Sequence, residues 1–193
     1  MSSKLYVYAS EFRDAEVQVR LDLVRVVLNP STRRRAHISL CGPYEQPLRE
    51  EVVRDLDRST RGVTLHIDGI GMFENAKERT VFLSCVPTRS LEVLWDKPQS
   101  SFSPHVTLYD GPDIPLAQEL ERRLSVVSPH FQLALAGIIE YQVGDTVPMD
   151  SPTYALGDAA ARELALSGDL VQKITQSRRI ELATIVLKEL SEP

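Results

Sequence analysis

The 193-residue chain contains few cysteines and no long apolar segment. Its two cysteines, Cys41 and Cys85, lie in separate apolar runs, so they form neither a disulfide framework nor a zinc motif. No run of about 18 apolar residues occurs, and the opening MSSKLYVYASEF lacks the apolar stretch and cleavage site of a signal peptide. The sequence therefore predicts a cytoplasmic protein with no membrane partner.

Positive charge is also in short supply. The 22 basic residues are outnumbered by 27 acidic ones, which gives a net charge of −5. A protein that holds long nucleic acid uses many basic side chains against the phosphates, so we do not expect such a partner here. A small nucleotide or an RNA end is still compatible with this charge. The 42% of hydrophobic residues is enough for one core in a chain of this length.

Two short motifs stand out against this background. HISL covers residues 37–40 and HVTL covers residues 105–108, and each places a histidine two positions before a hydroxyl residue. On a β-strand alternate side chains share a face, so His37 and Ser39 would point one way, as would His105 and Thr107. The apolar residues of each motif would then point into the core.

The two motifs open an internal repeat. A shift of 68 positions aligns residues 37–69 with residues 105–137 without a gap, and it matches Pro47 with Pro115 and Gly69 with Gly137. Each copy reads as strand, helix, strand. The chain is therefore expected to contain two related halves within residues 1–147.

The remaining patterns predict an α+β fold. Over residues 4–143 the order is strand, helix, strand, helix, a two-strand hairpin, a short helix, strand, helix and strand. After residue 147 the repeat ends, and residues 148–193 form a C-terminal extension that begins as a helix and completes the second half. Its last part fits a helix or a strand. We favour a strand, because apolar and β-branched residues alternate from Ile180 to Val186.

A pair of histidines in matching strands has a clear chemical use. In-line attack at phosphorus needs a base beside the entering oxygen and an acid beside the leaving oxygen. Histidine suits both tasks, because its ordinary pKa of about 6.5 allows one ring to be neutral while the other is protonated. Since His37 and His105 occupy equivalent positions, we expect similar surroundings for both. Which of them acts as the acid stays open.

The paired H-I-S-L and H-V-T-L, with GIGMFENAKERTVFLSCV between them, resemble the 2H phosphoesterase superfamily. This superfamily includes bacterial 2′-5′ RNA ligase-like proteins and cyclic nucleotide phosphodiesterases, and the resemblance covers about residues 3–143. It implies a bilobal α+β fold whose two pseudo-twofold-related lobes line a central cleft with antiparallel sheets and carry helices outside. It also implies a phosphoric diester hydrolase that uses His37 and His105 and needs no metal or cofactor.

Six further residues are candidates for substrate binding. Ser39 and Thr107 would donate hydrogen bonds to a phosphate. Members of the superfamily often carry a basic residue after the second motif, where this chain has Tyr109 on the expected face of His105. Arg35, in phase with His37, is our candidate for the replacement. The aromatic rings available to stack on a base are those of Tyr44, Phe73 and Tyr109.

The sequence thus supports two functions of different kinds. The first is a hydrolase that acts on a 2′,3′-cyclic phosphate or on a related small nucleotide or RNA-end phosphodiester. The alternative is a nucleotide-binding or sensor module that uses the same cleft without turnover. A metal site is not expected, since His37 and Cys41 would lie roughly 13 Å apart along a strand. The base, the linkage and the oligomeric state are left open, with a monomer as the expectation.

Overall fold

The computed structural model describes residues 5–32, 34–75, 78–96, 102–143 and 168–192. Its strands are β1 (Leu5–Phe12), β2 (Ile38–Tyr44), β3 (Thr64–Glu74), β4 (Arg79–Cys85), β5 (His105–Gly111) and β6 (His130–Val143). Its helices are α1 (Ala15–Leu28), α2 (Glu50–Thr60), α3 (Arg89–Leu94), α4 (Ile114–Ser125) and α6 (Gln176–Ser191). This order confirms the α+β class that the sequence patterns predict.

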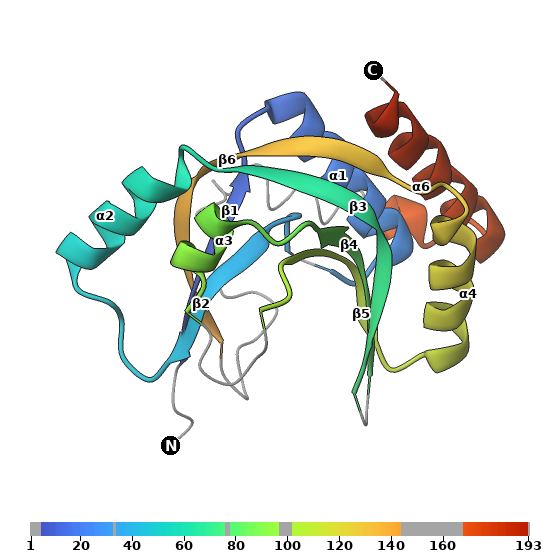
Figure 1. Cartoon of the computed structure of the whole chain (residues 1–193). Helices are drawn as coiled ribbons and strands as arrows, with labels where there is room; N and C mark the ends of the chain where they lie inside the picture. Colours follow the sequence, from blue (N-terminus) through green and yellow to red (C-terminus); the bar gives the residue numbers. More distant parts are fainter. Residues whose placement is uncertain (1–4, 33, 76–77, 97–101, 144–167, 193) are drawn as a thin grey trace.

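The six strands pair in the order β1-β2-β5-β4-β3-β6, and β6 returns to β1 so that the pairings form a closed ring. Every pairing is antiparallel. The long strands β3 and β6 run side by side across the top of the view in Figure 1. At the opposite side of the ring β2 meets β5, so the two histidine motifs are neighbours.

The helices begin at side chains that satisfy unpaired backbone N–H groups. Asp14 accepts hydrogen bonds from the N–H groups of Glu16 and Val17 at the start of α1, and Asp113 accepts one from Leu116 at the start of α4. Figure 1 shows α1, α4 and α6 together on one flank, whereas α2 lies on the other flank, where it contacts β6 and α3. The core lies between these helices and the strand ring, and its fully buried side chains include Leu21, Leu83 and Leu120.

Two sequence expectations need correction. The segment QPLREEVVRDL predicts a helix with Pro47 at its first position, but α2 begins at Glu50, with Arg49 as its N-cap. The C-terminal segment that we favoured as a strand is helix α6. Ile180, Ala183 and Leu187 are buried at helical spacing and pack toward α1 and α4, and Thr175 caps the first turn. The first part of the predicted extension, residues 148–167, lies outside the described residues.

The two places where the repeated halves meet have related registers. In the described chain β2 and β5 share one registered pair, Ile38 with Val106, which are 68 positions apart. In the other pairing, between β3 and β6, Leu65 faces Leu133, again 68 positions apart. The matched glycines Gly69 and Gly137 both have positive φ, at 89° and 147°, and each lies at a register shift in its strand.

None of the described helices has the length and apolar character needed to cross a membrane.

Candidate functional site

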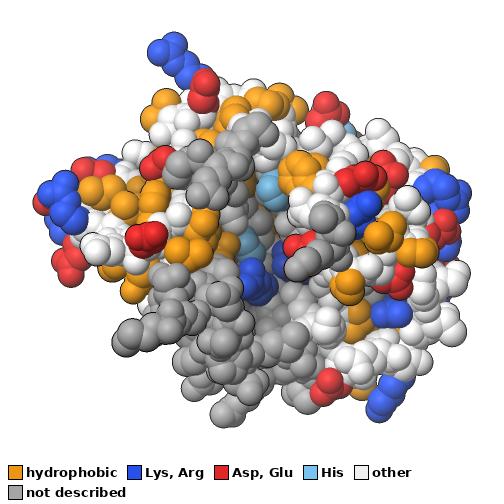
Figure 2. Space-filling model, turned by 90° about the horizontal axis from the view of Figure 1, so that it is seen from below, with side chains coloured by type: hydrophobic (Ala, Val, Ile, Leu, Met, Phe, Trp, Pro, Cys, Tyr) orange, Lys and Arg blue, Asp and Glu red, His pale blue; other side chains and the backbone are white. Residues whose placement is uncertain are grey.

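The pairing of β2 with β5 brings the two histidine motifs together. Ile38 and Val106 face each other and are fully buried in the core. Residues on either side of them point to the opposite face, and in an antiparallel pair this register places His37 across from Thr107 and Ser39 across from His105. Figure 2 shows histidine side chains inside a hollow on this face, with basic and apolar side chains on its walls.

Both histidines are anchored in the same way. His37 Nδ1 lies 2.8 Å from the carbonyl oxygen of Arg35, and His105 Nδ1 lies 2.8 Å from the carbonyl oxygen of Ser103. A carbonyl oxygen only accepts, so Nδ1 is the donor in each ring. In the neutral tautomer Nε2 is then the atom with a lone pair, and in the protonated ring it is a second donor. Both rings are therefore held through Nδ1 by the same kind of backbone contact.

The surroundings of His37 favour a neutral ring. His37 is 8% exposed, and its ring meets that of Tyr141 edge to face at a centroid distance of 5.7 Å. Burial, followed by the charges of Arg25, Arg34 and His105, lowers the pKa of His37 to about 3. The expectation of similar surroundings for the two histidines is wrong, because His105 is only half-buried.

An aromatic wall encloses His105 on β5. The ring of Phe73 meets it edge to face at 4.9 Å, and the ring of Phe82 lies 5.0 Å away. These two phenylalanines also contact each other at 4.2 Å. Gly71 leaves room for this wall, since a Cβ there would lie 2.6 Å from the Phe82 ring. Phe73 is thus beside a candidate catalytic histidine.

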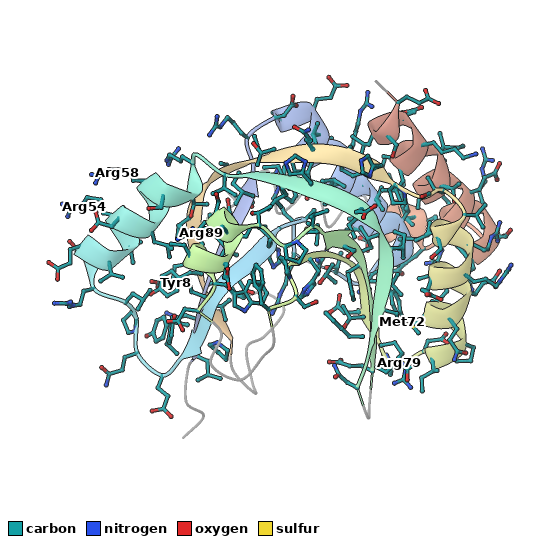
Figure 3. The ribbon with its side chains drawn as sticks, viewed as in Figure 1. Tyr8, Arg54, Arg58, Met72, Arg79 and Arg89 are labelled. Atoms are coloured by element: carbon teal, nitrogen blue, oxygen red, sulfur yellow. The ribbon has the colours of Figure 1, made fainter. Side chains whose placement is uncertain are left out.

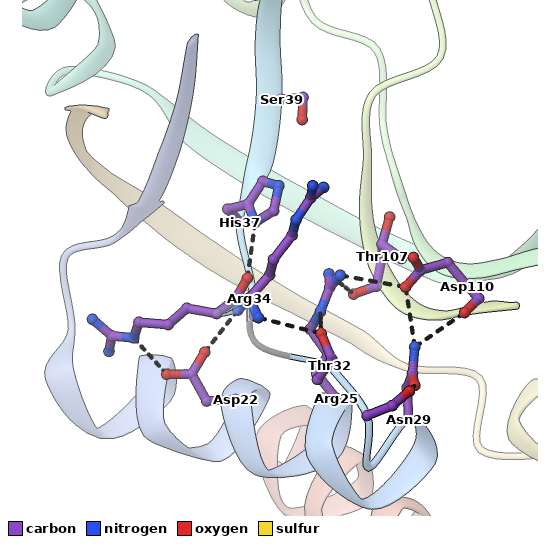
Figure 4. A network of polar contacts seen from close by, with 12 residues as sticks. Asp22, Arg25, Asn29, Thr32, Arg34, His37, Ser39, Thr107 and Asp110 are labelled. Carbon is purple, nitrogen blue, oxygen red and sulfur yellow. Dashed lines mark hydrogen bonds and ion pairs between the residues drawn. The ribbon is translucent and has the colours of Figure 1, made fainter. Parts of the chain in front are cut away.

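The two hydroxyl residues have different contacts. Ser39 Oγ lies 3.1 Å from the hydroxyl oxygen of Tyr141, whose ring also touches His37. The backbone carbonyl of Thr107 accepts a hydrogen bond of 2.9 Å from the buried Arg25 guanidinium. Figure 4 shows the side chains of Ser39 and Thr107 on β2 and β5, on either side of His37 and Arg34. Both hydroxyls therefore belong to the same side of the sheet as the imidazoles.

Two of the predicted binding residues lie elsewhere. Tyr44 is at the far end of β2, roughly 20 Å along the strand from His37, and it donates a hydrogen bond to the carboxylate of Asp96. Tyr109 belongs to the buried core and is 5% exposed. A bulge causes this change of face, because Thr107 pairs with Phe82 while Tyr109 pairs with Val81, so β5 has one extra residue between them.

Arg35, our predicted cation, forms ion pairs away from the histidines. Its guanidinium lies 2.8 Å from a Glu11 oxygen and 2.7 Å from an Asp22 oxygen. Asp22 Oδ1 also accepts the N–H of Ala36 at 2.7 Å, so this cluster holds the segment that enters β2 against α1. The contribution of Arg35 to the site is its carbonyl, which orients His37.

Four residues near the histidines were missed by sequence reasoning: Arg25, Arg34, Phe82 and Tyr141. Phe82 has a detectable signal, since it alternates with the core residues Val81 and Leu83 on β4. Arg25 lies in a helix 80 positions before His105, and no local pattern links the two.

Within the described parts of the chain, no group of three or more histidine, cysteine, aspartate or glutamate side chains is placed to hold a metal ion. No protein-family profile matches this chain, and no curated protein is significantly similar to it.

Proposed function

We propose that this chain is a metal-independent phosphodiesterase that acts on a 2′,3′-cyclic phosphate or on a related small nucleotide or RNA-end phosphodiester. The observation that supports this function best is the matched pair of imidazoles, each held through Nδ1 by the carbonyl two residues earlier. They extend from adjacent strands on one face of the sheet, with one hydroxyl residue beside each. Two such groups can serve the entering and leaving oxygens of one in-line displacement.

The unlike surroundings of the histidines support a division of roles. The low pKa of His37 favours the neutral ring that a base requires. His37 Nε2 takes a proton from water as the water oxygen bonds to phosphorus. The bond from phosphorus to the leaving oxygen breaks, and His105 Nε2 gives that oxygen its proton. The products are a phosphate monoester and an alcohol, and proton exchange with solvent restores both rings.

We further propose that the fold is bilobal, with two halves related by a pseudo-twofold axis through the β2–β5 and β3–β6 pairings. Both pairings join residues 68 positions apart, which is the period of the sequence repeat. The positive φ of both Gly69 and Gly137 supports the same relation. Such an axis would place the cleft where the two motifs meet.

The experiment compares His37→Ala and His105→Ala on two substrates, a nucleoside 2′,3′-cyclic phosphate and a p-nitrophenyl phosphodiester. On the cyclic phosphate each variant should lose roughly 10²-fold to 10⁴-fold in turnover, the range for a lost acid or base. p-Nitrophenolate leaves without a proton, so the loss in His105→Ala should shrink on that substrate while the loss in His37→Ala persists. The exposed His66→Ala is the matched control.

These results test two questions separately: whether both histidines take part in the reaction, and which of them is the base. Near wild-type turnover in either histidine variant on the cyclic phosphate would show that the two-histidine mechanism is wrong. If His37→Ala and not His105→Ala were rescued by the better leaving group, the roles would be reversed and the mechanism kept.

One observation favours the second candidate, a nucleotide-binding or sensor module. The position after the second motif holds Tyr109, which is buried in the core, so it supplies no cation to the site. A module of this kind would show nucleotide-dependent thermal stabilisation without product over a panel of cyclic and linear nucleotides.

A further inference from the structure

A phosphodiester is an anion, so the site proposed above needs a cation near its histidines. Among the residues that the structure describes, three arginines lie close in sequence or space to His37. Arg35 is held by Glu11 and Asp22, at 2.8 and 2.7 Å. Arg25 is 3% exposed, and its guanidinium donates to the carbonyl of Thr107 and lies 3.4 Å from Asp110. These two guanidinium groups hold protein groups in place.

Arg34 is placed differently. It is exposed, and no ion pair between its guanidinium and a carboxylate occurs among the described residues. The guanidinium carbon lies 5.5 Å from the centre of the Tyr141 ring, within the range of a cation–π contact. In Figure 4 the Arg34 side chain runs alongside His37 toward Ser39.

Tyr141 connects Arg34 to the rest of the site. The same ring that supports the guanidinium lies 5.7 Å from the His37 ring, and its hydroxyl lies 3.1 Å from Ser39 Oγ. Tyr141 is 6% exposed and is fixed on β6 opposite Val7 of β1. An aromatic side chain held in this way fixes the position of an arginine that would otherwise be mobile on the surface.

The basic side chain of Arg79, on the β3–β4 hairpin, does not supply this cation. Arg79 lies at the start of β4, near the tip of the β3–β4 hairpin (Figure 3), where it contacts Glu74 and the carbonyls of Asn75 and Glu78. His105 is bordered by the rings of Phe73 and Phe82. Among the described residues, the positive charge of the site therefore lies on the side of His37.

We propose that Arg34 binds the phosphate of the substrate, and that it replaces the cation missing after the second motif. The proposal rests on the phosphodiesterase function proposed above. The planar guanidinium donates two parallel hydrogen bonds to the non-bridging oxygens, while His37 and His105 flank the bonds that form and break. As water adds, negative charge grows on those oxygens, so the contact strengthens in the transition state.

Arg34 also acts on the base beside it. The charged groups that influence His37 are Arg25 from α1, Arg34 from the segment before β2 and His105 from β5, and all three lower its pKa. Removing the charge of Arg34 should raise the pKa of His37. The acidic limb of kcat/KM should then move to higher pH, which a purely structural role of Arg34 would not cause.

The test uses the full chain with Arg34→Gln, Arg34→Lys and a control, Arg54→Gln, which removes the same charge from the exposed face of α2 (Figure 3). The measurements are kcat/KM on a nucleoside 2′,3′-cyclic phosphate over a pH series and competitive inhibition by inorganic phosphate. Arg34→Gln should lose roughly 10²-fold in kcat/KM, as for a lost oxyanion donor. Its inhibition constant for phosphate should rise. Arg34→Lys should fall in between, because lysine keeps the charge and loses the fork.

The outcomes distinguish this proposal from the proposed function. If Arg34→Gln kept the wild-type kcat/KM, phosphate inhibition and pH profile while His37→Ala lost turnover, Arg34 would not be the phosphate ligand and the function would stand. If His37→Ala and His105→Ala also kept full turnover, the function itself would fail. Unchanged thermal unfolding of Arg34→Gln verifies that the variant is folded.

Discussion

His37 and His105 make the same backbone hydrogen bond in unlike surroundings. Each Nδ1 donates to a carbonyl at 2.8 Å, but His37 is buried next to positive charge while His105 is half-buried next to two phenylalanines. A buried imidazole resists protonation, because its charge would lose contact with water. In the proposed mechanism His37 is thus a base that is already neutral before substrate arrives.

The low pKa of His37 makes the stability of the protein depend on pH. In the unfolded chain His37 has the ordinary pKa of about 6.5, so below that pH the unfolded state binds a proton that the folded state refuses until about pH 3. His37 therefore contributes stability above pH 6.5, and this is lost as the pH falls toward 3.

We predict that His37→Asn flattens this dependence. Between pH 7 and pH 5 the wild type should lose up to about 2 kcal/mol more unfolding free energy than the variant, which follows from about 1.4 kcal/mol per pH unit. Urea unfolding at both pH values measures the difference, and His66→Asn controls for the loss of an exposed histidine. Equal losses in wild type and His37→Asn would contradict a buried neutral His37.

At the residue scale, the alternation of side chains along a strand predicted the face of some side chains correctly and that of others wrongly. His105 and Thr107 share a face as expected, because they lie in a regular strand. The rule fails for Tyr109, where a bulge adds a residue, and for Arg35, because β2 begins only at Ile38 and the preceding residues are not extended in the same way. Local sequence does not signal either irregularity.

On the scale of elements, the β3–β4 hairpin builds the aromatic wall beside His105. Gly71 on β3 lets the Phe82 ring of β4 approach the backbone of its partner strand, and the Phe73 ring lies 4.2 Å from it. The position of the Phe82 ring therefore depends on Gly71, which has no side chain.

We predict that Gly71→Ala disturbs this wall. The added Cβ would approach the Phe82 ring to 2.6 Å, so this ring, which lies 5.0 Å from the His105 ring, must shift. Overpacking of this kind costs about 1–3 kcal/mol in unfolding free energy, and kcat should fall as His105 is displaced. Thermal unfolding and turnover measure both effects. Gly62→Ala is the control, since its Cβ would meet only the Ser59 carbonyl at 3.8 Å; an effect in Gly71→Ala no larger than in this control would contradict the packing described.

Helix α6 shows why the type of an element can escape its sequence. The alternation from Ile180 to Val186 fits a strand, yet Ile180, Ala183 and Leu187 also fit one face of a helix. Contact with α1 and α4 selects the helix, because that face covers apolar surface on both. The deciding partners are more than 50 positions away in the chain.

On the scale of the whole molecule, the proposed reaction takes its proton transfers and its positive charge from side chains alone. We predict that turnover of a nucleoside 2′,3′-cyclic phosphate persists after dialysis against excess EDTA. Activity assays before and after dialysis test this, with thermal unfolding as a control for damage. Loss of turnover that one divalent ion restores would contradict the mechanism.

The order of elements follows from local patterns, whereas the closure of the ring does not. Periodicity identified all six strands, because each is apolar on at least one face. The choice of partners is set by contacts across long stretches of chain, as when β6 pairs with both β1 and β3. The repeat placed the two motifs in equivalent strands without predicting that these strands pair, and the pairing of Ile38 with Val106 is seen only in the structure.

In the bilobal fold proposed above, with β1–β3 as the first half and β4–β6 as the second, the ring also interlocks the two halves of the chain. β3 pairs only with β4 and β6 among the described strands, both from the second half, and β6 pairs with β1 and β3, both from the first. Within one half alone, the backbone N–H and C=O groups along both edges of the third strand would have no strand to pair with. A polypeptide with one copy would leave these edges open, but two such polypeptides could close the same ring as a homodimer. In such a homodimer the two motif histidines would have identical surroundings by symmetry, whereas in the single chain the surroundings of His37 and His105 can differ.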